Sequence, residues 1–193
     1  MRTFNKNQKL PGEILTKDEC FGLLDSFGDD FIGVRNRALI TVYWRSQLRC
    51  NEALDLAPFD LNLEKPSITV KNGKGGKRRV VGIDKESLPT LFRWIDIRDK
   101  SCKYLFHSRK STRIHDSYVR RMLKTAFKRA GYGKRIHAHA LRHTGAHEMA
   151  CEKIDIRIIS RQLGHSSLAV THTYLDHLCP EDVIEAVSCR TSF

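Results

Sequence analysis

Several features that mark metal-binding, secreted or membrane proteins are missing from these 193 residues. The six cysteines never form a C-x-x-C pair, so we expect reduced thiols rather than a zinc ribbon or a disulfide framework. The longest apolar run, from Ala38 to Trp44, is interrupted by Thr41 and falls far short of the roughly 20 residues that span a bilayer. Residues 1–12 contain no apolar stretch of the kind found in secretory signals. We therefore expect a soluble, cytoplasmic protein without contact to a membrane.

Common nucleotide-binding and zinc-binding strings are absent as well. Neither G-x-x-x-x-G-K-[ST] nor G-x-G-x-x-G can be drawn through Gly73-Lys74-Gly75-Gly76, so this turn is not predicted to bind ATP. His139, His143 and His147 follow one another at intervals of four, and histidines so spaced on a helix can share a zinc ion. No H-E-x-x-H string accompanies them. A metal site remains the less favoured alternative, and no cofactor is predicted.

Positive charge is what the sequence has in excess. Lys and Arg number 34 against 22 Asp and Glu, which gives a net charge of +12. Such a surplus is typical of proteins that bind a phosphate backbone, and double-stranded DNA is the predicted partner. A helix expected over 116–130 carries a basic stripe, for which a plain solvated face is the alternative. The residues predicted to contact DNA are Lys77, Arg78, Arg113, Arg120, Arg121, Lys124 and Lys128.

The apolar pattern predicts one mainly α-helical domain with a small antiparallel β-sheet, an α+β fold. Residues 1–12 are expected to form a flexible basic arm, and residues 13–193 the folded domain. Ile68 and Val70, then a glycine-rich turn, then Val80, Val81 and Ile83 predict the sheet. Helices are expected over about 17–26, 34–46, 85–99, 116–130, 138–151, 155–163 and 168–176, and a last one over 181–187.

Two strings near the C-terminal end hold residues suited to attack on a phosphodiester without a metal. In His139-Ala140-Leu141-Arg142-His143-Thr144, the first histidine and the arginine are three apart on an expected helix and can reach one anion together. In Leu163-Gly164-His165-Ser166-Ser167, the glycine suits a helix end and places the histidine at a corner between helices. Tyr174 is the candidate nucleophile. Taken singly, each could be an ordinary packing or surface residue.

Together these strings resemble the catalytic domain of the tyrosine recombinases, the phage integrase family, from about Leu15 to the C-terminus. The first catalytic arginine of that family lies in a motif like Gly-Leu-Arg-x-x-Glu. Here the motif is matched by residues 47–52, with Arg49 in place and Gln47 where the family has glycine. The family's hairpin lysine is matched by Lys74, and its nucleophile by Tyr174.

The resemblance implies an enzyme that cleaves and rejoins DNA strands through a 3′-phosphotyrosyl intermediate, without ATP or a metal. Two arginines would bind the nonbridging phosphate oxygens, one histidine would donate to them and another would accept the tyrosine proton. The lysine would protonate the departing 5′ oxygen. In this sequence the implied catalytic residues are Arg49, Arg142, His165, His139, Tyr174 and Lys74. Integration, excision, inversion and resolution share this chemistry.

The resemblance also bears on organisation and partners. Family members usually carry an N-terminal core-binding domain, which we expect to be absent here, as in a small standalone or truncated member. Recombination implies four protomers on DNA, and we expect the tail beyond Pro180 to dock on a neighbouring protomer rather than on its own core. The oligomeric state off DNA stays open, a monomer included. Two alternatives stay open: a type IB topoisomerase, and a DNA-binding accessory protein with a decayed active site. The intact strings favour the recombinase.

Overall fold

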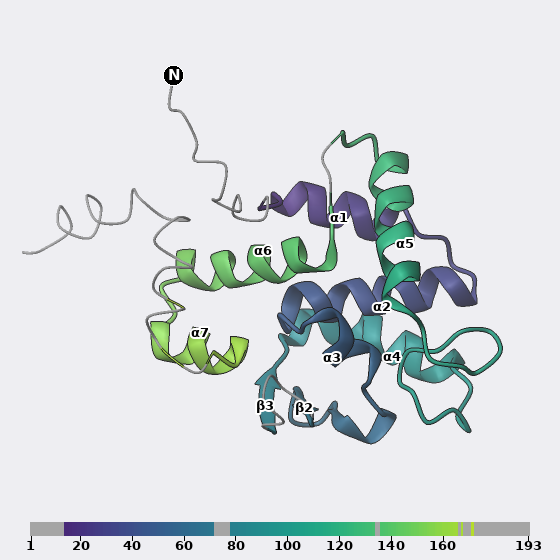
Figure 1. Cartoon of the computed structure of the whole chain (residues 1–193), viewed down its shortest axis with the longest axis horizontal. Helices are drawn as coiled ribbons and strands as arrows, with labels where there is room; N and C mark the ends of the chain where they lie inside the picture. The colour runs from purple at the N-terminus through teal and green to yellow at the C-terminus, as the bar shows by residue number, and fades with distance from the viewer. Residues whose placement is uncertain (1–13, 72–77, 134–135, 166, 168–170, 172–193) are drawn as a thin grey trace, which may run out of the picture.

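Helix α2 (Phe31–Arg45) is the central element of the computed structural model, which describes residues 14–71, 78–133, 136–165, 167 and 171 (Figure 1). It packs against α6 (Ala138–Cys151) and α4 (Leu88–Ile97). The other helices surround this group: α1 (Lys17–Asp25), α3 (Cys50–Leu54), α5 (Asp116–Arg129) and α7 (Ile156–Leu163). Two 3₁₀ turns, η1 (Pro58–Asp60) and η2 (Lys85–Ser87), lie beside the strands in the chain. The mainly helical class predicted from the sequence is confirmed.

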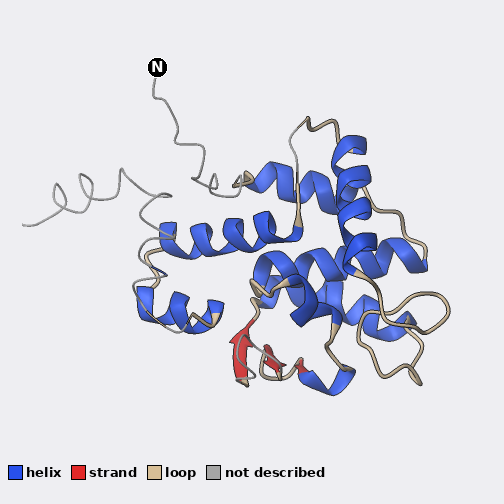
Figure 2. Cartoon of the chain, in the orientation of Figure 1, coloured by secondary structure: helices blue, strands red, loops and turns tan. Residues whose placement is uncertain are grey.

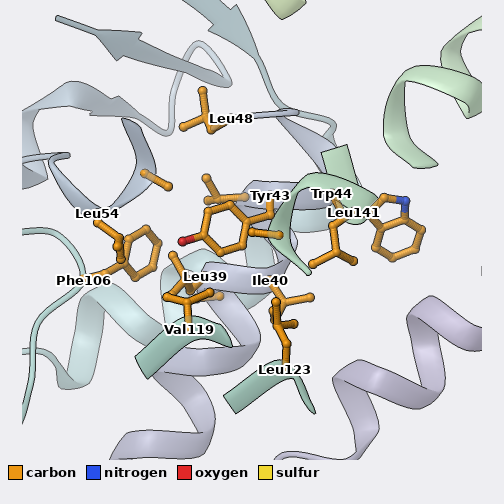
Figure 3. Close-up of a cluster of buried hydrophobic side chains, with 14 of the residues drawn as sticks. Leu39, Ile40, Tyr43, Trp44, Leu48, Leu54, Phe106, Val119, Leu123 and Leu141 are labelled. Atoms are coloured by element: carbon orange, nitrogen blue, oxygen red, sulfur yellow. The ribbon is translucent and has the colours of Figure 1, made fainter. Parts of the chain in front are cut away.

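The N-cap of helix α2 determines where it begins, and its apolar residues account for its burial. The Asp30 side chain accepts a hydrogen bond from the Gly33 backbone N–H at 3.0 Å, so the helix begins at Phe31 rather than at Val34 as expected. Further along, Leu39 and Tyr43 are fully buried. Figure 3 shows their side chains within one cluster that also receives residues of α5 and α6.

Other helix boundaries agree with the sequence in part. The capping box of α1 is present, with Thr16 and Glu19 each bonding the other's backbone N–H. The helix expected over 85–99 is instead the 3₁₀ turn η2 followed by α4, because Asp84 accepts the Ser87 N–H and tightens the first turn. The five-residue helix α3 is too short to leave a periodic signal in the sequence. The arm over 1–12 and the helices expected over 168–176 and 181–187 lie outside the described residues.

The sheet lies at one edge of the helices (Figure 2). Its strands β1 (Leu61–Asn62), β2 (Ser67–Val70) and β3 (Arg79–Gly82) are antiparallel and neighbours in chain order. Ile68 pairs with Val81, and both are buried, whereas Val80 is exposed. The predicted antiparallel sheet is thus confirmed, β1 is an addition, and β3 ends one residue before the expected Ile83.

Two packing features set the position of α6 and of the corner after α7. A Cβ added to Gly145 would lie 2.0 Å from the Trp44 carbonyl oxygen, so only glycine permits this approach of α2 and α6. A small cluster of Ala146, Ile159 and Leu163 joins α6 to α7. Burying a leucine of this kind contributes roughly 2 kcal/mol. The corner that carries His165 is therefore fixed by apolar contacts.

Some expectations from composition can be compared with the described part of the chain. Cys20, Cys50 and Cys102 are free thiols there. None of the helices within those residues combines the length and apolar character that crossing a membrane requires.

Candidate active site

A buried carboxylate, Glu52 of α3, holds two arginines. Arg49, the N-cap residue of α3, donates from Nη1 to Glu52 Oε1 and from its backbone N–H to Oε2, both at 2.9 Å. Arg79 of β3 donates from Nη1 to Oε1 at 2.9 Å and from Nη2 to Oε2 at 2.8 Å. Burial alone would raise the pKa of Glu52, but the bonds from Arg79 and Arg49 outweigh it and lower the pKa to about 2. Glu52 is therefore a permanent anion at neutral pH.

Arg142 of α6 reaches the same carboxylate from the core. Its side chain is 2% exposed and donates from Nη1 to the Gln47 carbonyl at 2.6 Å and from Nη2 to the Leu163 carbonyl at 2.7 Å. Nη1 also lies 4.0 Å from Glu52 Oε2. The guanidinium groups of Arg49 and Arg142 are thus gathered at one carboxylate. Together with Arg79, three positive charges face one negative charge, which favours the binding of an anion.

The Gln47 carbonyl is aimed at Arg142 by an uncommon backbone conformation. Gln47 has φ +50°, in the left-handed region that favours glycine, the residue found here in the motif this segment resembles. Its side chain donates to the Trp44 carbonyl at 2.8 Å and accepts a bond from Gln162 Nε2 at 2.9 Å. These bonds offset a backbone strain of about 1–2 kcal/mol. The turn therefore forms in this chain with glutamine in place of glycine.

His165 stands at the corner after α7, as the sequence predicts. Gly164 ends the helix with φ +65°, and the His165 backbone N–H donates to the Ser160 carbonyl at 3.1 Å. Nδ1 of His165 lies 2.9 Å from Oγ1 of Thr171, a fully buried residue. Burial, and then the charges of Arg142, Arg49 and Arg79, lower the pKa of His165 to about 4. The imidazole is therefore neutral at pH 7, and in the tautomer that accepts from Thr171 it carries its proton on Nε2.

His139 lies in the first turn of α6, where its ring meets that of His143 edge to face with centroids 4.1 Å apart. Part of the His139 surface is open to solvent, yet the surrounding protein desolvates the ring. This desolvation, followed by the charge of Arg142, lowers the pKa of His139 to about 4. The pKa of buried His143 falls to about 3, again chiefly through burial. Among the described residues, no three His, Cys, Asp or Glu side chains form a group that could hold a metal ion.

The structure brings together four of the six residues predicted to be catalytic: Arg49, Arg142, His165 and His139. Lys74 and Tyr174 lie outside the described residues, as does Lys77 of the predicted DNA surface. The other basic residues of that surface differ in their surroundings. Arg113 is partly buried and donates to Asp55 at 2.6 Å, and Arg120 bonds Asp116 at 3.2 Å on the exposed face of α5. Also exposed are Arg78, Arg121, Lys124 and Lys128.

Two residues that support the site, Arg79 and Glu52, are not among the catalytic residues predicted from the sequence. Arg79 is one of three consecutive basic residues, so composition does not distinguish it from its neighbours. The usable signal is the period of two in a strand, since Arg79 shares a strand face with the buried Val81. Applied to β3, this period would have predicted that the Arg79 side chain points to the same face as Val81.

Comparison with known proteins decides the family. The sequence model of the phage integrase family matches residues 13–179. The chain belongs to this family. It is 31% identical over 180 residues to a tyrosine recombinase of Thermosipho africanus, a match that covers 93% of this chain and 62% of the relative.

Solved structures of the family share the fold. The crystal structure of XerA recombinase matches with a TM-score of 0.80 and 31% identity, over 94% of this chain and 66% of the other. XerH site-specific recombinase, in a post-cleavage complex with a palindromic difH substrate, matches with a TM-score of 0.75 and 28% identity over 96% and 55%. The predicted catalytic-domain fold is confirmed. The chain spans about 60% of the length of the curated relatives it matches.

Proposed function

We propose that this chain is a site-specific DNA recombinase that breaks and rejoins strands through a covalent link to Tyr174. The observation that carries the proposal is the convergence of Arg49 and Arg142 on one carboxylate, next to two histidines with depressed pKa values. Membership of the phage integrase family supports it, as does the match to site-specific recombinases. Residues 13–193 would form the catalytic domain.

The cleavage step requires charge stabilisation on phosphorus and two proton transfers. The oxygen of Tyr174 would attack the phosphorus, and the bond to the 5′ oxygen would break, leaving a 3′-phosphotyrosyl link. Arg49 and Arg142 would donate to the nonbridging oxygens, whose charge grows in the transition state. His165, neutral at this pH, would add a further hydrogen bond from Nε2 in the tautomer whose Nδ1 accepts from Thr171. Each of these donors needs no change of protonation at neutral pH.

Proton transfer is assigned to residues on both sides of the phosphate. A free tyrosine has a pKa near 10, so it needs an acceptor for its proton at neutral pH. His139 is suited to that role because its lowered pKa keeps it neutral. Lys74 would give a proton to the departing 5′ oxygen. A 5′ hydroxyl from another strand would reverse these transfers and restore a phosphodiester bond, so no energy source is consumed.

DNA is the proposed substrate, and two features support it. Recombinases similar in fold were solved with DNA, among them XerH with its difH substrate. In this chain, Arg120, Lys124 and Lys128 lie exposed along α5. We propose that this stripe, with the other predicted basic residues, contacts the phosphate backbone. Four copies acting on two sites, joined through residues 181–193, complete the proposal; that segment lies outside the described residues.

The decisive experiment uses a DNA substrate nicked beside the cleavage position, so that the short fragment carrying the released 5′ hydroxyl diffuses away and the covalent complex accumulates. Wild-type protein should form a covalent protein–DNA complex, visible on a denaturing gel. Tyr174→Phe should form none while still binding the DNA. Tyr132→Phe is the matched control, because Tyr132 bonds the Asp18 carbonyl away from the site, and it should react like the wild type.

Two results would contradict the proposal. If Tyr174→Phe still forms the complex, the nucleophile is another residue. If the wild type relaxes supercoiled plasmid but never exchanges strands between two sites, the topoisomerase alternative is correct.

A further inference from the structure

Arg79 occupies a place that the proposed chemistry does not use. It lies on β3, five positions beyond Lys74 in the chain, and its side chain is only 13% exposed. Both of its terminal nitrogens bond Glu52, one to each carboxylate oxygen. Such a two-point bond fixes the plane of the carboxylate as well as its position.

The carboxylate that Arg79 fixes is the one that holds Arg49. Glu52 Oε1 accepts from both arginines at 2.9 Å, and Oε2 accepts from Arg79 and from the Arg49 backbone N–H. The Arg49 side chain is 31% exposed, and its guanidinium bonds Glu52 Oε1 through Nη1. A carboxylate free to rotate would leave that guanidinium with several orientations. The two-point bond from Arg79 holds the carboxylate in one orientation, and so holds the acceptor of the Arg49 bond in one place.

Arg79 also contacts the corner that precedes His165. A Cβ on Gly164 would lie 2.7 Å from Arg79 Nε and 2.8 Å from its Cδ. Gly164 is thus required both by its φ of +65° and by the passage of the arginine over its backbone. One side chain therefore touches the support of Arg49 and the support of His165.

We infer that Arg79 is a positioning residue, which orients Arg49 through Glu52 and braces the Gly164–His165 corner for the reaction. The inference rests on the proposed function. Two simpler roles compete with it. Arg79 could be an ion pair that serves folding alone, or it could bind the phosphate directly, independently of Arg49. The three roles predict different results when Arg79 is changed alone and together with Arg49.

The test measures the rate of covalent complex formation on the nicked substrate, DNA affinity and the melting temperature for each variant. Arg79→Met keeps the apolar length of the side chain and removes the guanidinium. Arg93→Met is the matched control, because Arg93 on α4 is an exposed arginine that pairs with Asp29 at 2.9 Å and has no part in the proposed DNA contacts. We expect Arg79→Met to slow cleavage about 100-fold, the cost of a small misplacement of a reacting group, and Arg93→Met to slow it less than about 3-fold. DNA affinity should be equal in the two variants.

The second arm separates positioning from direct binding. If Arg79 acts through Arg49, then adding Arg79→Met to Arg49→Lys should slow cleavage by less than about 5-fold beyond Arg49→Lys alone. Full multiplication of the two effects would show that Arg79 does not act through Arg49 and would overturn the inference. Equal cleavage rates in Arg79→Met and Arg93→Met would overturn it too. Should Arg79→Met fail to fold, Arg79→Lys replaces it in the same comparison, since lysine keeps the charge without the two-point bond.

Failure of the inference can be distinguished from failure of the proposed function. A wild-type protein that forms no covalent complex refutes the proposed function, and the positioning role with it. A wild-type protein that forms the complex, with Arg79 variants that match the Arg93 control, refutes the positioning role alone.

Discussion

The two arginines proposed to bind the phosphate are held by opposite means. Arg142 is buried, and its guanidinium is fixed by the carbonyls of Gln47 and Leu163, which belong to the ends of packed helices. Arg49 is partly exposed and is held by Glu52, whose orientation depends in turn on Arg79. The position of Arg142 follows from the packing of α2, α6 and α7. The position of Arg49 follows from a small charge network at the edge of the sheet.

This difference teaches which half of the site is part of the folding core. Carbonyls buried against Arg142 lose their partners if the arginine is removed, and each unpartnered acceptor costs about 1–3 kcal/mol. The partly exposed Arg49 contributes less to stability, because water competes for its guanidinium and Arg79 still pairs with the buried Glu52 when Arg49 is removed. On the core side, at Arg142, a substitution should therefore lower both catalysis and stability. On the sheet side, at Arg49, a substitution should abolish catalysis while the fold remains intact.

The largest expected effect is a difference in stability between alanine variants of the two arginines. Arg142→Ala should lower the free energy of unfolding by about 3 kcal/mol, because the Gln47 and Leu163 carbonyls lose their donor. Arg49→Ala should lower it by less than about 1 kcal/mol. Both variants should lose covalent complex formation. Urea denaturation followed by circular dichroism measures the stabilities, and equal losses in the two variants would show that both arginines serve the core alike.

Much of the fold could be predicted because it depends on patterns within single elements. The Thr16–Glu19 capping box and the positive φ of Gly164 follow from local residue preferences, and the structure has both. The alternation of Ile68 and Val70 placed a strand correctly. The start of α2 was wrong by three residues, since Asp30 is an effective cap ahead of a helix whose apolar period begins only at Val34.

The candidate site was predictable as a set of residue types, but its supports were not. Arg49, Arg142 and His165 follow from motifs. The bonds of Arg142 to two carbonyls, and the sharing of Glu52 by Arg79 and Arg49, join segments that are distant in the chain. Such contacts depend on how α6, α7 and β3 pack. No pattern within one element contains that information.

A change of pH should affect the stability contributions of His143, on the core side, and of Glu52, on the sheet side, over different pH intervals. The expected effect is smaller than that of the arginine substitutions. A histidine with a folded pKa below its unfolded value of about 6.5 contributes stability that is lost as pH falls, because the unfolded chain binds the proton first. The folded pKa of His143 is about 3, so its share is lost between pH 6.5 and that value. The pKa of Glu52 is about 2, so its share is lost only below about pH 4.5. Between pH 7 and 5, the free energy of unfolding should therefore lose the contribution of His143 and keep that of Glu52.

The measurement compares urea denaturation of the wild type and of His143→Gln at pH 7 and pH 5. The wild type should lose more stability over that interval, by about 1–2 kcal/mol, because glutamine does not titrate. An equal loss in both proteins would mean that His143 does not remain neutral in the fold.

The smallest expected effect concerns Gln47, whose carbonyl fixes Arg142. Gln47→Ala and Gln47→Gly both lose the side-chain bonds to Trp44 and Gln162, so their difference isolates the backbone at φ +50°. Glycine adopts this conformation without strain, and Gln47→Gly should be more stable than Gln47→Ala by about 1 kcal/mol. At Lys124, within α5, the same pair of substitutions should give the opposite order by about 1 kcal/mol, because alanine is the better helix former. If alanine were the more stable variant at both positions, the left-handed turn would not be what aims the Gln47 carbonyl. The position of Arg142 would then depend on helix packing alone.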